Sequence, residues 1–147
     1  MSLDFEKFAH EGNHFVNELS RDLGMENDRA RAGRILRAVM YTLRDRITLS
    51  EALDMLAQLP MPLKAVFSEN WKYRDKPLTI RRLDDFLKHI MDRANEMGDD
   101  TIRDEEQAKM FTKTVLEHLN RYVSKGEMDD MVTMMPEEIK PVFAFSY

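Results

Sequence analysis

The sequence predicts an all-α protein: a pseudo-symmetric helical bundle of two tandem four-helix repeats, each ordered long, long, short, short. Three observations predict it. Glycine and proline are scarce, with five of each in 147 residues, and strong helix formers abound. Apolar residues recur at helical spacing along the four long segments. Residues 48–67 and 124–143 hold Pro, Lys and Val-Phe in register, at a constant offset of 76 (124 minus 48). Two packed copies would bury more apolar surface than either copy alone.

The first half predicts two long helices and two short ones. Gly24 is a natural C-cap for the first, and Asn27 or Asp28 is the N-cap of the second. Thr48 and Glu51 form a capping box for the third, which ends at Pro60. The four expected segments cover about residues 3–23, 28–47, 49–59 and 61–71.

The second half predicts the same order after a basic linker. Long helices are expected over about residues 79–97 and 102–123. Ser124 and Glu127 form a second capping box at the offset of 76, and Pro136 ends the short helix that follows. The expected organisation is a first repeat over residues 1–71, a linker over 72–78 and a second repeat over 79–147. The two repeats are expected to pack as one compact unit.

Composition excludes several classes of protein. The chain has no cysteine, so disulfides and thiolate metal sites are excluded. It shows neither a signal peptide nor a run of 18 apolar residues, so we expect a cytoplasmic protein with no membrane segment. The net charge of −5 argues against non-specific nucleic-acid binding.

Residues 10–14 spell His-Glu-Gly-Asn-His, which matches the H-E-x-x-H pattern of zinc hydrolases. In those enzymes two His at i and i+4 bind the metal and the Glu activates water. A metal-dependent hydrolase using His10, Glu11 and His14 is therefore one alternative. Helical periodicity, however, places both His in the middle of the polar face, and Gly12 weakens the helix there. We expect His10 and His14 to bind metal adventitiously at most, and we expect no catalytic residue and no cofactor.

Two basic groups suggest binding functions. Arg34, Arg37 and Arg44 form a stripe opposite the apolar face of the second helix, so anion or nucleic-acid binding along it is another alternative. The alternative interpretation is that this side of the helix faces solvent and that its arginines pair with nearby acidic residues. Basic and aromatic residues also gather in and near the linker. The residues expected to bind a partner, in the seam between the repeats, are Trp71, Tyr73, Arg44, Asp45 and Arg46.

The run RAVMYTLRDRITLSEALDMLAQLP (Arg37–Pro60), with Phe-Ser-Glu-Asn-Trp ending at Trp71, resembles a prokaryotic family catalogued as a domain of unknown function. Its members are small, internally duplicated, all-helical proteins. The resemblance covers nearly the whole chain and implies the same fold and a bacterial origin. It implies no activity, because the family has none assigned.

The leading hypothesis is an uncharacterised bacterial helical protein that is not an enzyme and serves as a protein-interaction or scaffold module. The recurring residues, such as Leu43 and Leu59-Pro60, are packing residues, and fold alone does not define function. The expected partner is an unknown protein or a second copy of the chain.

Overall fold

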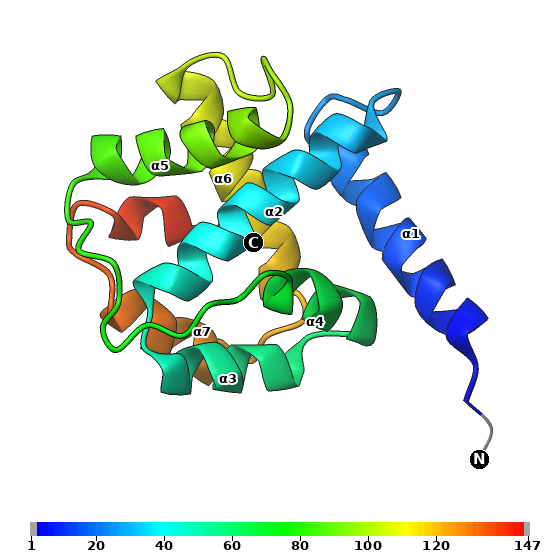
Figure 1. Cartoon of the computed structure of the whole chain (residues 1–147), viewed down its shortest axis with the longest axis horizontal. Helices are drawn as coiled ribbons and strands as arrows, with labels where there is room; N and C mark the ends of the chain where they lie inside the picture. The colour runs from blue at the N-terminus through cyan, green and yellow to red at the C-terminus, as the bar shows by residue number, and fades with distance from the viewer. Residues whose placement is uncertain (1–2, 146–147) are drawn as a thin grey trace.

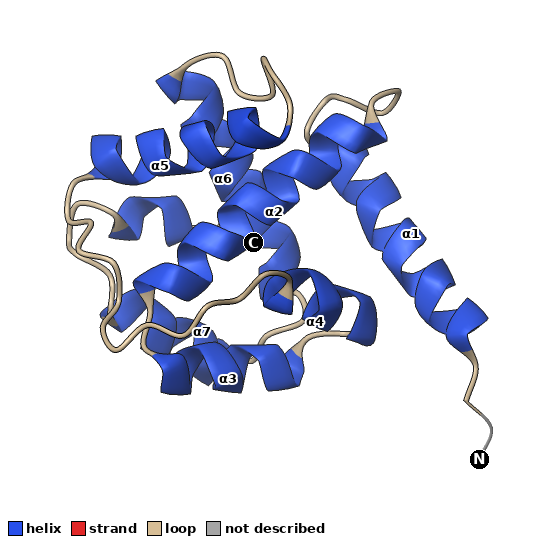
Figure 2. Cartoon of the chain, viewed as in Figure 1, coloured by secondary structure: helices blue, strands red, loops and turns tan. Residues whose placement is uncertain are grey.

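A computed structural model describes residues 3–145 and shows an all-helical protein, with no strand in that range (Figure 2). Among these residues, no helix is long and apolar enough to cross a membrane. The elements, in chain order, are α1 (Phe5–Asp22), α2 (Arg29–Arg46), α3 (Leu49–Gln58), α4 (Met61–Ser68), α5 (Leu83–Met97), α6 (Glu105–Asn120), α7 (Lys125–Thr133) and the 3₁₀ turn η1 (Lys140–Phe143).

Helix α2 runs through the middle of the molecule and packs against α1, α4, α5 and α6 (Figure 1). Its apolar residues Ile35, Val39 and Leu43 are buried, as the periodicity predicts. The opposite side is buried as well, since Tyr41 and Arg44 are at most 6% exposed. Residues 38–45 of α2 are all buried, whereas its N-terminal half is partly accessible, so α2 lacks the continuous solvated face that the sequence suggested.

One hydrophobic cluster extends through both halves of the chain. Phe67 and Leu43 from the first half and Phe86 and Leu119 from the second all belong to it, and each is nearly inaccessible to solvent. Contacts of α2 with α5 and α6 join the halves. The division into two repeats separated by residues 72–78 stays a prediction.

Helix α5 begins four residues later than expected, because the segment before it is hydrogen-bonded to the end of α2. The Leu78 N–H donates to the Asp45 carbonyl oxygen at 2.8 Å. Arg46 Nε donates to the Ile80 carbonyl oxygen at 2.9 Å. These bonds to the end of α2 use backbone groups of residues 78–80, and the helix starts only at Leu83.

The last short helix also differs from the prediction, since it is only the four-residue 3₁₀ turn η1. Pro141 at its start lacks a backbone N–H, and the turn ends at Phe143. The α4 segment at the corresponding place is a full α-helix of eight residues.

The predicted hydroxyl caps are confirmed in both halves. The Glu51 N–H donates to Thr48 Oγ1, and the Glu127 N–H donates to Ser124 Oγ, each at 3.2 Å. The second bond of the capping box is replaced at Ser124, whose N–H donates to Gln58 Oε1 at 2.6 Å. The Glu127 side chain is therefore available for another contact.

We expect Thr48→Ala to lower the free energy of unfolding by about 1 kcal/mol, because the first turn of α3 loses its hydroxyl acceptor. Urea denaturation would measure it. Thr48→Ser keeps the hydroxyl and should stay close to wild type. Equal losses in the two variants would show that the methyl group, and not the cap, matters at this position.

Candidate functional site

Arg44, near the C-terminal end of α2, is buried and binds the end of α4. Its Nη1 donates to the carbonyl oxygens of Phe67 at 2.7 Å and Glu69 at 2.6 Å. Its guanidinium carbon lies 4.4 Å from the ring centre of Tyr41 and 5.9 Å from that of Trp71. A cation at these carbonyls satisfies acceptors that a helix C-terminus leaves open. Arg44 therefore fixes α4 to α2.

The Asp45 carboxylate lies beside three guanidiniums, which come from three parts of the chain. Arg93 Nη1 of α5 donates to its Oδ2 at 3.0 Å. Arg44 Nε lies 3.5 Å and Arg74 Nε 4.0 Å from its Oδ1. Burial lowers the pKa of Arg44, and the charge of Asp45 acts in the opposite direction. The carboxylate thus offsets part of the cost of burying this cation and joins α2 to α5.

The residues expected to bind a partner therefore lie in one region but in different environments. Arg44 and Asp45 are buried, and Arg46 is committed to the Ile80 carbonyl. Trp71 is half-buried, with its ring edge against Phe67 at 5.8 Å between ring centres. Tyr73 is 73% exposed. A small hollow beside them is lined by charged residues of both signs (Arg44, Lys72, Arg74 and Lys76 with Asp45 and Asp75) and by Trp71 and other uncharged residues.

The predicted Arg34, Arg37 and Arg44 stripe is not a free basic surface. Arg34 Nε donates to Thr101 Oγ1 at 2.8 Å, and Arg37 Nε donates to Glu69 Oε2 at 3.2 Å. Arg44 is buried as described above. All three guanidiniums bind other parts of the fold, so the expectation of a solvated stripe is wrong at Arg44. A phosphate chain would have to displace these contacts.

His10 and His14 lie on α1 and face solvent, as the periodicity predicts. His10 is exposed, and His14 Nε2 lies 3.4 Å from Glu18 Oε1 with 66% of its side chain accessible. Within residues 3–145, the His, Asp and Glu side chains that converge in a group of three lie elsewhere, at Glu51, Glu127 and Asp130. Neither His takes part in that group.

Gly12, inside the H-E-x-x-H pattern, is explained by packing. A Cβ at this position would lie 3.0 Å from Pro62 Cβ, closer than ordinary van der Waals contact. The missing side chain lets α1 approach the start of α4. The glycine therefore has a structural reason that is independent of metal binding.

An apolar surface that the sequence analysis did not single out lies where α1 meets α4. Leu3, Phe5 and Met61 are 70%, 69% and 50% exposed. The Phe5 and Phe8 rings meet edge to face, with 6.2 Å between centres. We name this the α1–α4 surface; its residues are Leu3, Phe5, Phe8, Ala9, Met61, Pro62 and Ala65.

The sequence predicted the apolar stripe of α1 correctly but not its environment. Phe5 and Phe8 share that stripe with Phe15 and Leu19, which are buried. The N-terminal half of α1 extends beyond the body of the molecule, so the stripe runs past the core (Figure 1). Periodicity shows which side of a helix is apolar, and it cannot show how much of that side finds a partner.

The fold and these sites define a small all-helical protein whose main buried charge network holds its own helices together. The family model described as "Uncharacterized conserved protein (DUF2267)" matches residues 12–142, and the chain belongs to this family. The resemblance found in the sequence is thereby confirmed. A search of the curated proteins finds no match. Within the α1–α4 surface, Leu3, Phe5, Phe8 and Ala9 precede the matched range, whereas Met61, Pro62 and Ala65 lie within it.

We expect Arg44→Met to lower the free energy of unfolding by about 3 kcal/mol, because two carbonyls lose a charged donor and Asp45 loses a neighbour. Arg37→Met is the matched control on the same helix. Its ion pair with Glu69 is partly exposed (42% and 35%), so about 1 kcal/mol or less is expected. Urea denaturation of both variants tests this. Equal small losses would contradict the role given to Arg44.

Proposed function

We propose that this protein is a non-catalytic interaction module and that it self-associates through the α1–α4 surface. The observation that carries the proposal is the exposure of Leu3, Phe5 and Met61 side by side, at 70%, 69% and 50%. A contiguous group of exposed apolar residues on a protein surface is typical of a site that contacts another protein. The proposal also includes a bacterial origin and a cytoplasmic location, which the family resemblance and the composition support.

A second copy of the chain suits this surface because its hollow is apolar on both sides. Leu3, Phe5 and Phe8 line it from the N-terminal segment, and Met61 and Pro62 line it from α4. A two-fold arrangement would bring the same apolar residues of both copies together, and an isologous contact of this kind closes as a dimer.

The size of the surface supports a weak dimer. A stable interface uses roughly 20–30 residues from each partner, and the α1–α4 surface has the seven residues named above. We therefore expect a dissociation constant in the micromolar range or weaker. Such an interface would respond strongly to protein concentration.

The Trp71 seam supports the same class of function less well. Arg44 and Asp45 are buried there, and their hydrogen-bonding groups bind α4 and α5. Tyr73 is left as a single well-exposed aromatic residue. The hydrolase alternative has two solvent-facing His on α1 and no third converging ligand within residues 3–145.

We expect the full-length protein to show a concentration-dependent rise in molar mass towards a dimer in sedimentation velocity between about 10 and 500 μM, the range in which a small interface associates. Met61→Lys should shift this rise to higher concentration by at least tenfold, because each copy would bury a charge in the contact.

Met110→Lys is the matched control, because Met110 is 57% exposed on α6 and lies away from the α1–α4 surface. It should associate like the wild type, and both variants should keep wild-type circular dichroism. A wild type that stays monomeric at 500 μM, or equal effects of the two lysines, would overturn the proposal.

A further inference from the structure

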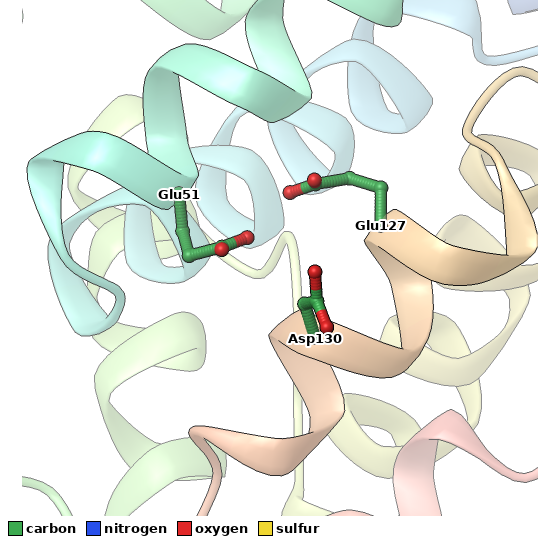
Figure 3. A group of neighbouring side chains, drawn as sticks. All are labelled: Glu51, Glu127 and Asp130. Carbon is green, nitrogen blue, oxygen red and sulfur yellow. The ribbon is translucent and has the colours of Figure 1, made fainter.

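Three carboxylates meet where α3 of the first half packs against α7 of the second. Glu51 comes from the first turn of α3, and Glu127 and Asp130 come from α7. Figure 3 shows the three side chains pointing towards one another across the contact. One oxygen from each lies within 4.8 Å of the others. The two Glu stand at the offset of 76 that relates the predicted repeats.

Glu127 is the part of this group that needs a ligand. It is only 8% exposed, and its Oε1 is buried without a hydrogen-bond donor among the described residues. Glu51 Oε2 is likewise buried without a hydrogen-bond donor among the described residues. A buried carboxylate oxygen is ordinarily paired with a donor or a cation, because leaving it unpaired costs the energy of removing it from water. Here the side chain is aimed at two further carboxylates.

The charges around Glu127 have a single sign. Burial raises its pKa to about 7, and a hydrogen bond shared with Glu51 and the charges of Glu51, Asp54 and Asp130 act in the same direction. Nearby Lys125 lies 3.7 Å from Asp129 instead. Within residues 3–145 no lysine or arginine forms an ion pair with Glu51, Glu127 or Asp130, in contrast to Asp45, which has three guanidiniums within 4.0 Å.

We propose that Glu51, Glu127 and Asp130 bind one Ca²⁺ ion at the contact between α3 and α7. Ca²⁺ takes oxygen ligands at about 2.3–2.6 Å, so two of its ligands lie at most about 5 Å apart. The three oxygens lie within 4.8 Å of one another, inside this limit. Mg²⁺ binds at about 2.0–2.1 Å, so its ligands lie at most about 4 Å apart and it fits the same group less easily.

The exposure of the three residues suits entry of an ion from solvent. Asp130 is exposed, Glu51 is half-buried and Glu127 is buried, so the site opens on the Asp130 side. Water would fill the remaining positions, as is usual where a protein supplies few oxygens. The bound ion would tie α3 to α7, and so the first half of the chain to the second. This inference does not depend on self-association.

Calcium binding is tested on the full-length protein after EDTA treatment and dialysis, at pH 7.5. We expect CaCl₂ to raise the midpoint of thermal unfolding in a saturable way, with MgCl₂ giving a smaller rise. Titration calorimetry should give about one Ca²⁺ per chain. Glu127→Gln, which keeps the shape of the side chain, should reduce calcium affinity at least tenfold.

Asp129→Asn is the matched control, since Asp129 precedes Asp130 on α7 and lies outside the group. It should bind Ca²⁺ like the wild type. Equal losses in Glu127→Gln and Asp129→Asn, or no calcium response of the wild type up to 10 mM, would overturn the proposal. Since calorimetry of the wild type needs no variant, poor folding of Glu127→Gln would not prevent the test.

Discussion

The buried contact between Arg44 and the end of α4 is the interaction on which the arrangement of the helices depends. A guanidinium with 3% exposure must have its charge compensated inside the protein. Nη1 donates to the carbonyls of Phe67 and Glu69, and the Asp45 carboxylate lies 3.5 Å from Nε, which makes no hydrogen bond among the described residues. Because Asp45 also binds Arg93, a change in the position of α4 would disturb α5 as well. Arg44 and Asp45, two adjacent residues of α2, therefore hold α2, α4 and α5 together.

The same end of α2 determines the path of the chain between the halves. The backbone oxygen of Asp45 and the side chain of Arg46 hold Leu78 and Ile80. Leu78 and Ile80 thus attach the segment to the end of α2, although the segment contains neither helix nor strand. This attachment explains why Arg44, Asp45 and Arg46 look like a binding motif in the sequence. Arg44 and Arg46 donate to carbonyl oxygens of the same chain, and the Asp45 carbonyl oxygen accepts from the Leu78 N–H.

Local sequence rules predicted the elements well, and they failed where distant parts of the chain meet. The caps at Asp28, Thr48 and Ser124 were predictable because each depends on residues three positions away. The late start of α5 depends on hydrogen bonds to α2, more than thirty residues earlier, so no local pattern contains it. The burial of Arg44 is of the same kind, because helical spacing places a residue on a side but does not say what covers that side. Glu51 and Glu127 were found as caps, and only packing of α3 on α7 makes them neighbours.

Two charged groups in the interior of residues 3–145 differ in a way that bears on function. Around Asp45 the fold supplies cations from α2, from α5 and from the segment between the halves, so this carboxylate is paired without a ligand. At the contact of α3 and α7 the fold instead brings together carboxylates alone, with Glu127 buried among them. Folding must then be opposed by repulsion and desolvation at this contact, unless a proton or a cation enters. A group that the chain leaves incomplete is the place where an external ion gains the most, and this distinguishes the carboxylates from the other buried charges.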